Sequence, residues 1–136
     1  MRGIRGATTV DYNEAEHIWT RTKRLLAEMV EANNVQPDQV VHIWFTVTTD
    51  IDAAFPAKAA RMLPGDWSYV PVMCATEIPV PNSLPRCIRV MATVNTEVSS
   101  RDIRHVFQED AIKLRPDLTK QAGGDYAKKE ESRKEV

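Results

Sequence analysis

The chain has one segment with the spacing of a long helix and several with the spacing of strands, and this imbalance constrains its fold most. Residues 15–30 place apolar side chains on one face of an amphipathic helix, whereas residues 41–47 alternate between apolar and polar as a half-buried strand does. One helix can cover only one face of a sheet. We therefore predict an α+β domain with a mixed β-sheet whose other face is buried by self-association.

The rest of the pattern predicts further strands, a helix cap and short helices. Asp11 and Glu14 resemble a capping box before the long helix, and the Ala-rich segment 52–63, broken by Pro56, predicts a brief helix. Trp44 and the other strand aromatics are assigned to the core. The expected strands are 2–10, 41–47, 69–75, 87–96 and 106–114, with a short helix over 99–105.

The length of 136 residues suits one ordinary core. We expect a single domain over residues 1–118. From residue 119 onward Gly123, Gly124 and mixed charges offer nothing to bury, which predicts a flexible charged tail over 119–136.

The charge balance gives no overall attraction to polyanions. Eighteen Lys and Arg oppose nineteen Asp and Glu, for a net charge of -1, so nucleic acid and membranes are not expected partners. No segment has the length of a membrane span or the pattern of a signal core. Cys74 and Cys87 have neither the spacing of a disulfide framework nor that of a zinc site. We expect a reduced, cytoplasmic protein without a metal or cofactor.

Three charged residues stand where charge is costly to bury. Arg89 lies inside an apolar run, Glu77 follows an apolar strand, and Arg5 stands between Ile4 and Gly6. These groups could serve a small anionic ligand. Equally, Glu77 and an arginine could form an ion pair with a purely structural role, and the residues alone leave both interpretations open.

A second basic group, Lys58 and Arg61, would share one face of a helical turn, although a solvated surface explains that spacing more simply. Arg115 before Pro116 is typical of a loop. The histidines have no acid or nucleophile at recognisable spacing, and Cys74 has no nearby cation in sequence. The inventory lacks the groups of nucleophilic or metal catalysis and fits a small anion that is bound or rearranged.

Six segments match one enzyme family in order and spacing over roughly residues 2–118. They are Arg2–Thr9, Phe55–Ala59, Tyr69–Val72, Cys87–Met91, Ile103–Val106 and Leu114–Leu118. Each is weak alone, but together they resemble the monofunctional chorismate mutases of the Bacillus type. The resemblance implies rearrangement of chorismate to prephenate, in the biosynthesis of Phe and Tyr, by a homotrimeric pseudo-barrel with active sites at the subunit interfaces.

The resemblance also implies roles for individual residues. Arg89 would donate to the ether oxygen, where negative charge develops, and Arg5 would bind a carboxylate. Glu77 would accept from the ring hydroxyl, with Cys74 beside it. The other substrate-binding residues would be the apolar walls Phe55, Ala57 and Val72, the cations Lys58, Arg61 and Arg115 near the mouth, and Met73, Phe107 and Leu114.

Two residues depart from the family pattern. Met73 stands where the family usually has Thr, and Phe107 where it has Tyr. Each change removes a hydroxyl, which bears on substrate affinity more than on the type of reaction. An alternative is a trimer of the YjgF type, either a regulator that binds small carboxylates or an imine deaminase. The combination of Arg5, Glu77 and Arg89 with Phe-Pro-Ala-Lys favours the mutase.

Overall fold

A computed structural model describes residues 1–114, so Arg115 and the expected tail lie outside the described residues. The elements, with η for a 3-10 helix, are β1 (Arg2–Thr9), α1 (Ala15–Ala32), η1 (Pro37–Gln39), β2 (Val40–Val47), η2 (Pro56–Met62), β3 (Val72–Thr76), β4 (Cys87–Val94), η3 (Ser100–Asp102), β5 (Val106–Phe107) and η4 (Glu109–Lys113). The α+β class is confirmed. Within the described range, no helix has both the length and the apolar character needed to cross a membrane.

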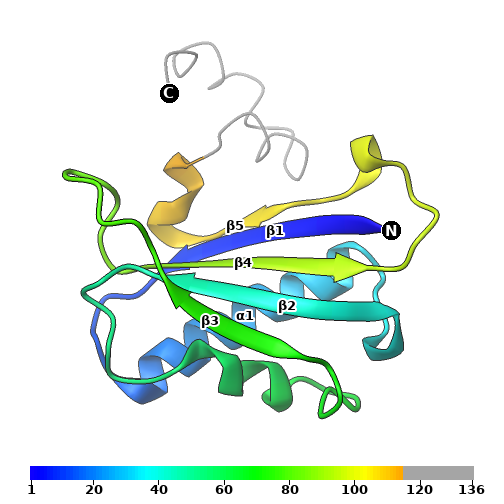
Figure 1. Cartoon of the computed structure of the whole chain (residues 1–136), viewed down its shortest axis with the longest axis horizontal. Helices are drawn as coiled ribbons and strands as arrows, with labels where there is room; N and C mark the ends of the chain where they lie inside the picture. The colour runs from blue at the N-terminus through cyan, green and yellow to red at the C-terminus, as the bar shows by residue number, and fades with distance from the viewer. Residues whose placement is uncertain (115–136) are drawn as a thin grey trace.

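The five strands form one mixed sheet in the order β3-β2-β4-β1-β5 (Figure 1). The central strand β4 is antiparallel to both of its neighbours, β1 and β2. The edge strands β3 and β5 run parallel to β2 and β1. Arg89 of β4 stands opposite Ala7 of β1 and Thr46 of β2, which places this arginine at the middle of the sheet.

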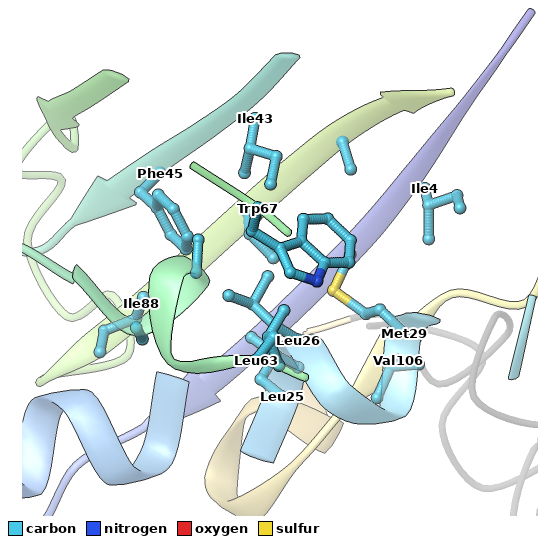
Figure 2. Close-up of a cluster of buried hydrophobic side chains, with 14 of the residues drawn as sticks. Ile4, Leu25, Leu26, Met29, Ile43, Phe45, Leu63, Trp67, Ile88 and Val106 are labelled. Atoms are coloured by element: carbon cyan, nitrogen blue, oxygen red, sulfur yellow. The ribbon is translucent and has the colours of Figure 1, made fainter. Parts of the chain in front are cut away.

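The core lies between the sheet and α1, which crosses behind the strands in Figure 1. Figure 2 shows how side chains of α1 meet those of the sheet, with Trp67 and Leu63 beside them. Gly6 allows Met29 of α1 to approach the backbone of β1 closely. A Cβ there would collide with Sδ of Met29 and lie only 3.0 Å from Cγ1 of Val90. Gly6 therefore faces the helix, and its neighbours Arg5 and Ala7 face the other way.

Three local expectations are wrong. The predicted capping box is absent, because Glu14 caps α1 without a side-chain bond and Asp11 instead accepts from Nη2 of Arg21 at 2.8 Å. The predicted strand 106–114 ends after two residues, because Glu109 takes a φ of 53° and η4 follows. Trp44 is not in the core, since its side chain lies on the sheet face away from α1 and is 42% exposed.

Other boundaries shift without changing the element. β3 begins at Val72 rather than at residue 69, because Pro71 has no N–H for the ladder and contributes only its carbonyl, which accepts from Ile43 at 2.9 Å. The expected brief helix over 52–63 is η2, a 3-10 helix that starts at Pro56. β4 ends at Val94, two residues early, and η3 covers only part of 99–105.

Candidate active site

One face of the sheet lies away from α1 and carries the charged residues that the sequence singles out. η4 packs against one corner of this open face, over Ala7 and Phe107. The rest of the face exposes large side chains, among them Trp44, Met73 and Met91 at 42%, 58% and 41%. Arg89 stands in the middle of this surface and not in the apolar core.

Arg89 and Glu77 form a bidentate ion pair on the open face. Nε of Arg89 donates to Oε2 of Glu77 at 2.5 Å, and Nη2 donates to Oε1 at 2.8 Å. The hydroxyl of Thr46 also donates to Oε2 of Glu77. The backbone N–H of Glu77 donates to the carbonyl of Val47 at 2.8 Å, which ties the end of β3 to β2. The carboxylate is thus oriented by three donors, and the ion pair leaves Nη1 of Arg89 unused.

The pair fixes the charge of both groups. The hydrogen bonds from Arg89 lower the pKa of Glu77, partial burial opposes them, and the hydrogen bond from Thr46 lowers it further. The same hydrogen bonds raise the pKa of Arg89. Glu77 is therefore a carboxylate at neutral pH, able to accept but not to donate a proton. The side chain of Arg89 is 44% exposed, so this is not an ion pair sealed inside a core.

Two hollows meet at Arg89. The first, called here the Arg5 hollow, is lined by Arg5, Gly6, Ala7, Trp44, Thr46, Arg89, Val90, Met91 and Phe107. The second, the Glu77 hollow, is lined by Thr48, Glu77, Ile78, Val80, Ser83, Leu84, Cys87, Arg89 and Leu114. The structure thus gathers five of the predicted site residues, Arg5, Glu77, Arg89, Phe107 and Leu114, around one exposed guanidinium.

The other predicted residues lie elsewhere in the chain. Phe55 and Cys74 line a third hollow, the Phe55 hollow, together with Val47, Ile51, Asp52, Ala53, Ala54, Pro56, Ala75 and Thr76. Val72 and Cys74 project to the helix side of β3, where both pack against the core. The structure therefore does not place Cys74 beside Glu77 within one chain. Lys58 and Arg61 are exposed on η2, and Met73 is on the open face.

Neither thiol has the character of a nucleophile. Burial raises the pKa of Cys74, against a smaller opposite effect of the backbone N–H of Ala57. Burial also raises the pKa of Cys87, to about 11. Within residues 1–114, no three His, Cys, Asp or Glu side chains are grouped as a metal ion would require.

The histidines are engaged with the fold. Nδ1 of His105 accepts from the backbone N–H of Arg5 at 2.9 Å, and Nε2 of His17 accepts from that of Asp11 at 3.0 Å. His42 shares a hydrogen bond of 3.1 Å with the hydroxyl of Thr93. Each ring therefore has a partner that a structural role explains.

Thr46 and Trp44 also belong to this surface, although neither is among the predicted site residues. Both follow from the alternation of β2, since residues 42, 44 and 46 share a face. Ile43 and Phe45 alternate with them on the buried face, so the pattern indicates which face is open but not which charged residues meet there.

The chain is similar to known proteins over most of its length. A family model described as chorismate mutase type I matches residues 1–118. Over 119 residues the chain is 50% identical to chorismate mutase AroH of Bacillus subtilis (strain 168), covering 88% of this chain and 93% of that protein. Over 119 residues it is 47% identical to chorismate mutase AroH of Thermus thermophilus, covering 87% and 96%. A solved chorismate mutase from Clostridium thermocellum is 50% identical with a TM-score of 0.79, covering 82% of this chain and 97% of that one. This chain belongs to the chorismate mutase type I family.

Proposed function

We propose that the chain is a chorismate mutase, an isomerase that converts chorismate to prephenate in aromatic amino acid biosynthesis. The Arg89–Glu77 pair carries the proposal. A guanidinium with a fixed charge stands exposed between two hollows, one of which also holds Arg5. Membership of a family named for this reaction gives the substrate, a dianion with one ring hydroxyl.

The reaction suits a site that has donors but no activated nucleophile. Chorismate breaks an ether C–O bond and forms a C–C bond within one molecule, so the enzyme needs to hold a compact conformer and to stabilise charge on the ether oxygen. Nη1 of Arg89 is not used by Glu77, and we assign it as the donor to that oxygen. Arg5 would bind a carboxylate of the substrate.

Glu77 would accept a hydrogen bond from the ring hydroxyl. Its low pKa keeps it an acceptor, and Thr46 holds Oε2 in place. Phe107 lines the Arg5 hollow and would contact the substrate through its ring alone. Leu114 would close the Glu77 hollow on its apolar side.

We further propose that the complete site forms between two subunits of a homotrimer. Within one chain, Phe55 and Cys74 line a hollow apart from the two that meet at Arg89. Phe55 is 76% exposed, so its ring is available to a partner surface. The open face of the sheet exposes further apolar side chains that a neighbour would cover. The walls Phe55, Ala57, Val72 and Cys74 and the cations Lys58 and Arg61 of one subunit would then meet Arg89 of the next.

We place the enzyme in the cytoplasm, where the free thiols of Cys74 and Cys87 stay reduced.

The test of the proposed function is to add chorismate, follow the loss of its diene ultraviolet absorbance and identify prephenate as the product. Light scattering should give a trimer at micromolar concentration. Turnover should persist after exhaustive chelation. A trimer that binds small carboxylates but leaves chorismate unchanged would instead support the YjgF-type alternative.

A further inference from the structure

Trp19 of α1 makes two contacts with the segment that leads into η2. Its indole N–H donates to the carbonyl of Phe55 at 3.0 Å. The ammonium of Lys58 lies over the indole ring, 4.0 Å from its centroid. A single side chain from the helix thus holds a backbone carbonyl and a cation three residues apart, both on residues that the proposed function assigns to substrate binding.

These contacts do more than fill space. The side chain of Trp19 is only partly buried at the edge of the core, where an aliphatic side chain could also pack. An aliphatic side chain would have no N–H for Phe55 and no π face for an ammonium. The indole therefore adds two directional contacts to its packing.

The contact with Lys58 orders a flexible cation without removing its charge. A lysine side chain has a flexible stem of four carbons and loses conformational freedom when its ammonium binds an anion. A cation–π contact restricts the ammonium beforehand, while the N–H groups directed away from the ring stay available to a carboxylate. Trp19 also fixes the backbone at Phe55, whose exposed ring stands at the start of the same segment.

We propose that Trp19 is a positioning residue that holds Phe55 and Lys58 ready for the anionic substrate. The inference rests on the proposed function, because it needs Lys58 to meet a substrate carboxylate. That carboxylate keeps its charge through the rearrangement, so the gain is equal in ground state and transition state. Such uniform binding appears in KM and hardly in kcat.

The test compares substitutions that remove the two contacts separately. Trp19→Phe keeps a ring under Lys58 but loses the N–H, and should raise KM about twofold. Trp19→Leu loses both contacts and should raise KM about 5- to 10-fold, with kcat within about a factor of two. In a Lys58→Met background the ring has no cation to hold, so Trp19→Leu should then raise KM only about twofold.

Val30→Ala is the matched control. Val30 is another partly buried residue of α1 that packs against the core, but it lies by Val35 and Trp67, away from the Phe55 segment. It should lower the melting temperature and leave KM unchanged. If Trp19→Leu does not fold, the KM values of Trp19→Phe and Lys58→Met still test the roles of the indole N–H and of the Lys58 cation.

Given an active wild type, three outcomes overturn the inference while the proposed function stands. In the first, both Trp19 variants keep the wild-type KM. In the second, KM falls in Trp19→Leu, and in the third, Val30→Ala changes KM as much as Trp19→Leu does. A fall would mean that Trp19 keeps Lys58 away from the substrate. A wild type that does not convert chorismate overturns the proposed function, and the inference with it.

Discussion

Replacement of Arg89 by alanine should abolish most turnover and leave the fold nearly intact. The variant loses the preorganised donor to the ether oxygen, and loss of one such donor typically costs about 10²- to 10³-fold in kcat. Stability should change only moderately, because the Arg89 side chain is 44% exposed, although the Glu77 carboxylate that it leaves behind is only 15% exposed. Glu77 keeps its hydrogen bond from Thr46 in the variant. The melting temperature should therefore fall by no more than several degrees.

Arg89→Lys tests the geometry of the guanidinium. The arginine uses two nitrogens for Glu77 and has a third for the substrate, whereas lysine has a single nitrogen for both tasks. Lysine restores the charge but not the fixed directions of the donors. Its kcat should lie between those of alanine and wild type, at least about tenfold below wild type.

The assay is steady-state loss of chorismate absorbance, with a melting curve for each variant. Arg24→Ala is the matched control, because Arg24 also forms an ion pair, with Glu109, on the surface outside the three hollows. It should have a small effect on stability and none on kcat. A folded Arg89→Ala protein with near-normal kcat would refute the assignment of Arg89.

Three further changes test other parts of the structure. Gly6→Ala should destabilise the fold by about 1–3 kcal/mol in chemical denaturation, because its Cβ would press against Met29 behind the sheet; an unchanged midpoint would contradict this packing. Phe107→Tyr should lower KM several-fold and leave kcat within about a factor of three, because a new hydroxyl would face the Arg5 hollow; a level or higher KM would show that residue 107 does not meet the substrate. Thr46→Val removes a donor that lowers the pKa of Glu77, so this pKa should rise and the acid limb of the kcat/KM profile should move to higher pH. Thr46→Ser keeps the hydroxyl and should leave the acid limb where it is in the wild type. Coincident pH profiles of Thr46→Val and wild type would exclude the role of Thr46.

The sequence predicted those elements whose pattern is long enough to repeat. α1, β2 and β4 each show several periods of their pattern, so their existence followed from alternation or helical spacing. β5 has only two residues, too few to show any period. Its end depends on the backbone of Glu109, which no spacing reveals. Short elements are set by such local conformations and by contacts with distant segments.

The site was predictable where a charge interrupts an apolar run. Arg89 stood out inside such a run and Glu77 just after an apolar strand, and an ion pair of Glu77 with an arginine was one of the two interpretations left open. The role of Thr46 was not predictable, because a threonine in a strand is ordinary and its bond to Glu77 joins residues 31 positions apart. The assignment of Trp44 to the core was wrong because it followed the aromatic character of the side chain, although the alternation puts residue 44 on the face opposite Ile43 and Phe45.

The strand order also has a consequence for how the chain folds. β1 precedes the other four strands along the chain, yet its partners in the sheet are β4 and β5, the last two of the five. Arg2 pairs with Val94, so the centre of the sheet cannot close until most of the domain has been synthesised. Pairing over such sequence separation costs loop-closure entropy before it gains any contact, which slows folding. Until then β2 can pair only with β3, while β1 stays unpaired and prone to aggregate, so the centre of the sheet closes late rather than growing from β1.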